Sequence, residues 1–263
     1  LTIFILFMSA GLAFTVDTDS LEFALANENN RRRKVDLLNR LIEAYKEEQP
    51  ELVMEKAKQA ISLAESIKYE EGFADAHDHA GDYYMNRQSI DSALGHYNMA
   101  LSVYKGLTND RKIGLTLYKI GSAFFSTSNY QAALQYTNEA LEIFRIIGDN
   151  QVLATVHTLL CDIKSYMGFK ESALEDCHTA LELYESLELQ RGNANLLNSV
   201  GNIYLDIGQY ERARQYFNQA LFIAKAENDT YTTATSISNL GHMYLGLGDI
   251  REAIRYYMRA LEL

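Results

Sequence analysis

Residues that break helices are scarce in this chain. Its 263 residues include one proline, 15 glycines and no tryptophan. Hydrophobic residues make up 48% of the sequence, which is enough to build an extended core. So little proline and glycine favours a nearly all-helical chain with short turns.

Positive charge is also in short supply. The chain has 24 Lys and Arg against 35 Asp and Glu, a formal net charge of -11 and a pI near 5.0. A nucleic-acid surface needs clustered basic residues to neutralise phosphates, so we expect no nucleic-acid partner for this region. The basic run at 31–34 is interpreted as a solvated first helical turn.

Motifs for chemistry are missing. The sequence has no glycine-rich phosphate loop, no GxSxG elbow and no HExxH. We therefore predict no catalytic residue, no cofactor and no enzyme activity in this chain. His77 and His79 lie near Asp75, Asp78 and Asp82, but residues two apart on a helix point in different directions. We predict no metal site there.

The N-terminal 16 residues form an apolar run without a charge, LTIFILFMSAGLAFTV. This pattern is typical of the apolar part of a secretory signal peptide and predicts export, with a cytoplasmic location as the alternative. A membrane anchor is a second interpretation, although a spanning helix needs about 20 apolar residues. A helix packed on the first repeat is a third. Residues 17–33 are expected to form a linker, with a short irregular helix as the alternative.

A 40-residue repeat organises the rest of the chain. Gly81, Gly121, Gly201 and Gly241 are separated by multiples of 40 residues. With Gly201 as position 8, alanine recurs at position 27 in all six repeats, and small residues recur at position 20. A fixed period of this length is typical of a helical solenoid.

Residue types within the repeat predict two antiparallel helices. Small residues at positions 8, 20 and 27 allow close helix approach, and large residues at 11 and 24 fill the space around them. Gly168, Gly208 and Gly248 should end the first helices, and Pro50 should lie in the first turn of a second helix.

This GxxY…G…A…A skeleton resembles the tetratricopeptide repeat. The resemblance implies an all-α, right-handed α-solenoid of about six helix-turn-helix repeats over residues 34–263. Their expected starts are near 34, 74, 114, 154, 194 and 234, and the last repeat is expected to be incomplete. An uncapped end exposes apolar surface, so self-association through the C-terminal repeat is expected.

The family binds partners in a concave groove lined by its first helices. Transferring the groove positions by register gives the following candidates: Asp75, Asp78, Asp82, Met85, Tyr118, Ser122, Phe125, Asp162, Tyr166, Asn195, Asn198, Asn202, Asp206, Ser238, Asn239 and His242.

Two sets within this groove suggest specific contacts. Asn195, Asn198 and Asn202 share one helix face, and their amides could grip an extended peptide backbone. The Asp75, Asp78 and Asp82 set would favour a basic segment. For both sets a solvated polar helix face is the alternative.

Cys161 and Cys177 lie at positions 8 and 24 of one repeat. If position 8 lies opposite position 21, the two sulfurs are offset by about one helical turn. We interpret them as buried free thiols, with a disulfide as the alternative in an exported chain.

These features predict a module that binds a protein or peptide segment. The leader and the 40-residue repeats resemble the sensory halves of bacterial signalling proteins that carry a kinase, cyclase or DNA-binding output domain. The alternative is a stand-alone scaffold without an output domain. In either case, only the N-terminal run or a segment beyond this chain would contact a membrane.

Overall fold

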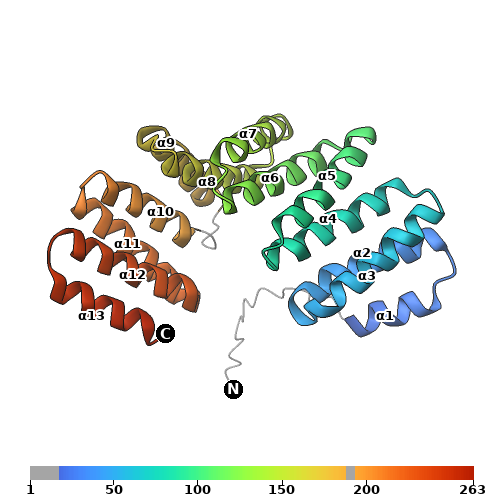
Figure 1. The fold of residues 1–263 in the computed structure, drawn as a ribbon, viewed down its shortest axis with the longest axis horizontal. Helices are drawn as coiled ribbons and strands as arrows, with labels where there is room; N and C mark the ends of the chain where they lie inside the picture. Colours follow the sequence, from blue (N-terminus) through green and yellow to red (C-terminus); the bar gives the residue numbers. More distant parts are fainter. Residues whose placement is uncertain (1–17, 188–192) are drawn as a thin grey trace, which may run out of the picture. The chain divides into compact units, whose positions relative to one another are not determined.

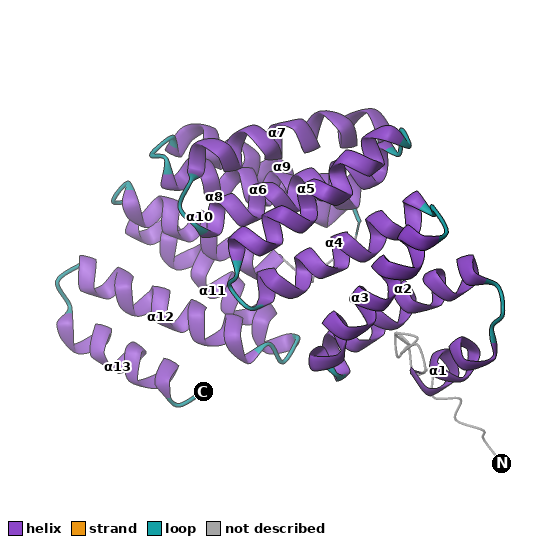
Figure 2. Ribbon diagram, turned by 45° about the vertical axis from the view of Figure 1, so that its right-hand side comes forward, coloured by secondary structure: helices purple, strands orange, loops and turns teal. Residues whose placement is uncertain are grey.

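The computed structural model describes residues 18–187 and 193–263 (Figure 1). The N-terminal run with the proposed signal peptide lies outside the described residues. All regular structure in the described part is helical, without strands (Figure 2). None of the described helices is long and apolar enough to cross a membrane.

One short helix and six helical hairpins make up the described chain. The short helix is α1 (Thr18–Asn27). The hairpins are α2 (Arg31–Glu48) with α3 (Pro50–Ser66), α4 (Glu70–Asn86) with α5 (Ile90–Gly106), α6 (Asp110–Ser126) with α7 (Tyr130–Ile147), α8 (Asn150–Tyr166) with α9 (Lys170–Ser186), α10 (Asn193–Asp206) with α11 (Tyr210–Ala226), and α12 (Thr230–Gly246) with α13 (Ile250–Leu261). The all-helical repeat fold expected from the sequence is confirmed. First helices begin at residues 31, 70, 110, 150 and 230, three or four residues before the expected starts.

The helices group into two compact units. The N-terminal compact unit ends at Asn109 and contains α1–α5, and the C-terminal compact unit begins at Asp110 and contains α6–α13. Each has its own core of small residues and large aliphatic or aromatic side chains.

Turns between paired helices use a left-handed residue. Gly168, Gly208 and Gly248 all have positive φ, and the Gly208 amide donates to the Leu205 carbonyl at 2.9 Å. Glycine adopts this conformation without steric cost, so the predicted helix ends are confirmed. Gln88 and Ser128 have φ of 57° and 60° at the equivalent positions.

The segment predicted as a linker is largely helical. Within α1, Leu21 is buried in the core of the N-terminal compact unit. Glu22 accepts a 2.7 Å hydrogen bond from Tyr45 and forms a 2.7 Å ion pair with Lys56. The linker prediction is therefore corrected, and the alternative of a short helix is confirmed. Leu21 and Leu25 pack on the core of the N-terminal compact unit. The segment is shorter than one repeat, so the 40-residue period could not identify it as a helix.

Within a hairpin, position 8 faces position 24. A Cβ added to Gly201 would lie 2.4 Å from the Phe217 ring, and one added to Gly81 would lie 2.3 Å from the Tyr97 ring. An aromatic ring thus fills the space that glycine leaves on the opposite helix. Gly241 has the same relation to Tyr257.

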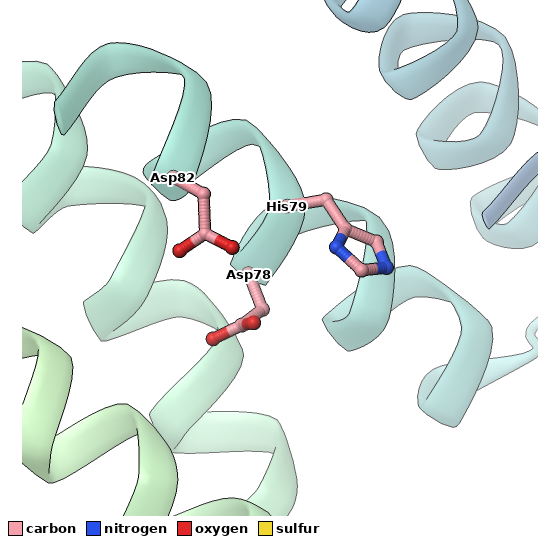
Figure 3. A group of neighbouring side chains, drawn as sticks. All are labelled: Asp78, His79 and Asp82. Carbon is pink, nitrogen blue, oxygen red and sulfur yellow. The ribbon is translucent and has the colours of Figure 1, made fainter. Parts of the chain in front are cut away.

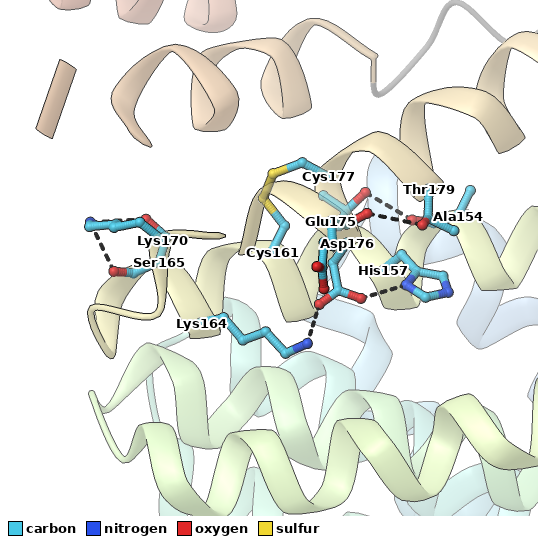
Figure 4. Close-up of a disulfide and its surroundings, with 11 residues drawn as sticks. Ala154, His157, Cys161, Lys164, Ser165, Lys170, Glu175, Asp176, Cys177 and Thr179 are labelled. Carbon is cyan, nitrogen blue, oxygen red and sulfur yellow. Dashed lines mark hydrogen bonds and ion pairs between the residues drawn. A yellow bond between two sulfur atoms is a disulfide. The ribbon is translucent and has the colours of Figure 1, made fainter. Parts of the chain in front are cut away.

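This register corrects the interpretation of the two cysteines. Cys161 and Cys177 occupy positions 8 and 24 of the α8–α9 hairpin and form a disulfide, with Cα atoms 5.2 Å apart (Figure 4). The free-thiol interpretation assumed that position 8 lies opposite position 21. The close helix approach that glycine allows elsewhere brings the two cysteines within bonding range.

A second pair of positions, 11 and 23, also differs in this hairpin. Aromatic rings stack there in other hairpins, as Tyr204 and Tyr216 do with centroids 5.4 Å apart. In α8–α9 these positions hold Lys164 and Asp176, which form a 2.5 Å ion pair. His157 adds a 2.8 Å contact from Nδ1 to the same carboxylate (Figure 4).

Candidate functional site

A hollow of about 560 Å³ lies on the first helices of the C-terminal compact unit. These helices contribute polar side chains because their other faces are buried in the hairpins. The hollow is lined by Phe125, Asp162, Ser165, Tyr166, Lys170, Ser199, Asn202, Leu205, Asp206, Asn239 and His242. Seven of these residues belong to the groove expected from the sequence: Phe125, Asp162, Tyr166, Asn202, Asp206, Asn239 and His242.

Asp162 is the most enclosed carboxyl group of this hollow. Burial raises its pKa above the usual value, and a hydrogen bond from Ser199 acts in the opposite direction. A buried carboxylate gains most from a cation or a hydrogen-bond donor that arrives with a ligand. Asp162 is therefore suited to contact a positively charged or donor group.

A second carboxylate, Asp206, is exposed and already has a cation. Lys170 at the start of α9 contacts Asp206 and also donates to the Ser165 carbonyl at 3.0 Å. Within the lining there are thus two carboxylates and one lysine, and the lysine is engaged. The resulting charge favours a cationic ligand.

Two aromatic rings, Phe125 and Tyr166, line the hollow, and Tyr130 packs against them. Tyr166 stacks on Tyr130 with centroids 5.5 Å apart, and Phe125 meets Tyr166 edge-on at 5.5 Å. Tyr166 remains 67% exposed. These rings therefore offer an aromatic surface, whereas Asn202 and His242 offer exposed polar groups.

The three asparagines do not form a continuous ladder. Asn198 is buried, donates to Ser236 at 2.9 Å and accepts from Asn239 at 3.3 Å, so it joins α10 to α12. Asn195 is exposed but accepts from Thr232 at 3.1 Å. Asn202 alone of the three lines the hollow. The Asn198 prediction is corrected, because the packing of α12 on α10 buries that part of the helix face.

The acidic set lies in the N-terminal compact unit and binds its own neighbours. Asp75 accepts from Tyr104 at 2.6 Å, and Asp82 accepts from Tyr97 at 2.8 Å. These carboxylates therefore hold α4 against α5. The alternative interpretation from the sequence, a polar helix face that contacts only solvent, does not describe them.

Asp78, His79 and Asp82 can each bring one ligand atom within 4.8 Å of the others (Figure 3). A lysine ammonium already forms an ion pair with this group. The Lys46 ammonium is 2.9 Å from Asp82 and 2.5 Å from Glu43, and Glu43 is 3.3 Å from His79 Nδ1. A metal ion would have to displace this lysine.

The remaining predicted residues lie outside the hollow. Tyr118 is half-buried against two apolar clusters, and burial raises its pKa. Ser122 on α6 and Ser238 on α12 are half-buried.

Sequence reasoning missed four lining residues. Ser165 and Leu205 occupy position 12 of the repeat, as the predicted groove residues Met85 and Phe125 do, so applying that position to every repeat would have found them. Ser199 lies at position 6, and Lys170 comes from a second helix, where no groove residue was sought. The lysine follows the turn and reaches back over it to Ser165.

A larger hollow of about 1060 Å³ lies between α9, α10 and α11. His178, Glu182 and Glu185 form one wall, and Gln215 and Gln219 belong to the other. This hollow was not predicted from the sequence, because only first helices were considered as binding elements.

Comparison with known proteins supports the resemblance to the tetratricopeptide repeat in the C-terminal part of the chain. The family model described as tetratricopeptide repeat matches residues 152–226 and 192–263. Response regulator aspartate phosphatase A of Bacillus subtilis (strain 168) is 24% identical over 156 residues, which cover 56% of this chain and 39% of that protein. The chain thus spans well under half of the length of this relative. The phosphatase activity in the relative's name is stated of the relative.

Two solved structures share the fold over most of the chain. A signal transduction ATPase with a tetratricopeptide repeat sensor from Pyrococcus horikoshii has a TM-score of 0.74 at 17% identity, covering 92% of this chain and 38% of that one. The Rap conjugation gene regulator of plasmid pLS20, solved with the Phr* peptide, has a TM-score of 0.67 at 14% identity, covering 93% and 73%. At such identities the likeness shows the fold alone.

Proposed function

We propose that this tetratricopeptide-repeat protein binds a peptide or protein segment in the hollow on α6, α8, α10 and α12. The main support is that side chains from four successive first helices line one open hollow. Their chemistry combines a half-buried carboxyl, exposed amide and imidazole groups, and an aromatic surface. An extended segment can satisfy all three at once. The Phr* complex of a protein with this fold is consistent with such a ligand.

The charge of the hollow points to a segment with a basic side chain or a free amino group. Asp162 is the group that would meet it, since Asp206 is paired with Lys170. A peptide library displayed on phage and selected against the purified chain should therefore yield cationic peptides. Asp162→Asn should weaken their binding more than the binding of neutral peptides.

Two exposed histidines provide a matched test of the location. His242→Ala and Asn202→Ala should each weaken selected peptides by up to about tenfold, as expected for loss of one hydrogen bond. His178→Ala alters the larger hollow and should leave affinity unchanged. Loss of binding in His178→Ala with none in His242→Ala would place the ligand in the larger hollow instead.

We further propose that the chain is exported and serves as the sensory part of a signalling protein. The apolar run at 1–16 and the buried disulfide both favour an oxidising compartment. The repeat sensor of the signal transduction ATPase offers a parallel for the role. Cell fractionation followed by thiol alkylation under denaturing, non-reducing conditions tests this: we expect a periplasmic, non-alkylated protein, and a cytosolic protein with two alkylated cysteines would contradict it.

Self-association through α13 is a separate proposal. Leu261 is 87% exposed, whereas Leu141 at the same position of α7 is 6% exposed beneath the next hairpin. Ile254 and Met258 are also exposed on α13. Sedimentation velocity should show concentration-dependent dimers that Met258→Glu with Leu261→Glu abolishes.

A further inference from the structure

Two histidines face one another across the α4–α5 hairpin. His77 lies at position 4 and His96 at position 23, and their Nδ1 atoms are 3.0 Å apart. The ring centroids are separated by 5.0 Å. Both residues are half-buried, so part of the pair is accessible to solvent. The groove does not involve them.

Aromatic neighbours hold both rings in place. Phe73 packs on His77 with centroids 4.4 Å apart, and Tyr84 stacks on His96 at 5.3 Å with an interplanar angle of 21°. Side chains held by packing on two helices lose little freedom when a ligand binds between them. This kind of preorganisation favours ion binding.

The separation of the two nitrogens suits a shared metal ion. A transition metal binds imidazole nitrogen at about 2.0–2.1 Å, which places two neighbouring ligands roughly 2.9–3.3 Å apart at angles between about 90° and 109°. The observed 3.0 Å lies within this range. We propose that His77 and His96 form a two-histidine site for a divalent transition-metal ion of the Zn²⁺, Ni²⁺ and Cu²⁺ class, bound through both Nδ1 atoms.

Imidazole is the ligand type that these ions prefer, and their remaining coordination positions would be taken by water on the accessible side. Metal binding requires neutral rings. Burial lowers the pKa of both histidines, that of His77 to about 4, so protons compete little at neutral pH. In the absence of metal, an N–H···N hydrogen bond between the rings accounts for the same distance. When the ion binds, that proton would move to Nε2 of the same ring, which leaves both Nδ1 lone pairs for the metal.

The equivalent positions of α8–α9 provide an internal comparison. There His157 Nδ1 lies 2.8 Å from Asp176, whose carboxylate also binds Lys164. Positions 4 and 23 thus lie within bonding distance in both hairpins. The lysine supplies a positive charge in one, whereas the contacts of His77 and His96 are with each other and with aromatic rings.

The test is calorimetric titration of the untagged, chelator-treated chain with Zn²⁺ and Ni²⁺. We expect one ion per chain, and an affinity at least about tenfold lower in His96→Phe. Phenylalanine keeps an aromatic ring against Tyr84 while removing the ligand, so circular dichroism should show an unchanged fold. His77→Phe should behave in the same way. With Cu²⁺, electron paramagnetic resonance should show coupling to two imidazole nitrogens in the wild type.

The control is His79→Ala, on the same helix but directed toward Glu43. It should bind metal as the wild type does. Equal affinity in wild type and His96→Phe would overturn the proposal. Loss of binding in His79→Ala alone would also overturn it and would assign the ion to the Asp78, His79 and Asp82 group.

Discussion

The hairpins α8–α9 and α10–α11 are neighbours in sequence with the same fold but different internal bonds. In α10–α11, Phe217 covers Gly201 and Tyr204 stacks on Tyr216. In α8–α9, the same four positions hold a disulfide and an ion pair. The backbone therefore tolerates two solutions, one based on packing and one on covalent and ionic bonds. Packing is insensitive to reductant, whereas a disulfide is not, so the two hairpins should respond to different conditions.

The largest effect is expected from Phe217→Ala in α10–α11. Phe217 is fully buried against Gly201, and its truncation leaves a cavity that should cost about 3–5 kcal/mol in the free energy of unfolding. Urea denaturation followed by circular dichroism measures it. Phe222→Ala, on the same helix but 76% exposed, should change stability by less than about 0.5 kcal/mol. A small loss for Phe217→Ala would mean that packing is not what holds this hairpin.

Reduction of the disulfide should have the second-largest effect on stability. The bond joins residues 16 apart in the sequence, and its loss should lower the free energy of unfolding by roughly 3 kcal/mol. Urea midpoints with and without a phosphine reductant give this value. The double variant Cys161→Gly with Cys177→Phe installs the bond-free pair of α10–α11 and should be indifferent to reductant. If the urea midpoint of the fully reduced wild type equals that of the oxidised wild type, the disulfide does not stabilise the α8–α9 hairpin.

The ion pair of α8–α9 predicts a pH dependence that the aromatic stack lacks. Burial alone would raise the pKa of Asp176, but hydrogen bonds from His157 and Lys164 lower it below the ordinary 3.8. Since the folded pKa is the lower one, the carboxylate stabilises the fold above the unfolded value. That contribution is lost as the pH falls below 3.8 and through the folded pKa.

Asp176→Asn tests this dependence. It should cost about 1–3 kcal/mol at pH 7, because it removes the charge that Lys164 and His157 contact. The difference from wild type should shrink as the pH falls toward 3. A difference that stays constant across this range would show that the charge of Asp176 contributes nothing.

The smallest effect on stability is expected at the groove. Asn202→Ala removes an exposed side chain and should change stability by less than about 0.5 kcal/mol. Asn198→Ala, one turn earlier, leaves the buried Ser236 and the amide of Asn239 without this partner and should cost about 1–3 kcal/mol. Thermal unfolding distinguishes them. Equal losses would mean that both asparagines serve the same purpose.

The period of the sequence was sufficient to predict the hairpins and their turns. Gly168, Gly208 and Gly248 fixed the ends of first helices because only a few residue types accept a positive φ. The period did not give the axial offset between the two helices of a hairpin. For that reason position 8 was placed opposite 21, and the disulfide was interpreted as two thiols. The recurrence of an aromatic residue 16 positions after glycine, as in Gly201 and Phe217, carried the correct register.

The groove was only partly predictable for a similar reason. Register identifies which face of a first helix points away from its own partner helix, and this selected Asp162 and His242, which line the hollow. It does not say which part of that face the next hairpin covers. Asn198 is buried by its contact with Ser236 on α12 and does not line the hollow. Lys170 lines the hollow from α9, a second helix, and only first helices were considered.

The position of the disulfide also determines how the chain responds to mechanical tension. The bond joins two residues of one hairpin, 16 apart, and links no hairpin to another. If the array is pulled from its ends, every hairpin can still be extracted in turn, but the loop between Cys161 and Cys177 cannot be extended. The fully stretched oxidised chain is therefore shorter than the reduced one by about 50 Å, the length of that loop. In single-molecule pulling, the α8–α9 step alone would lengthen on reduction.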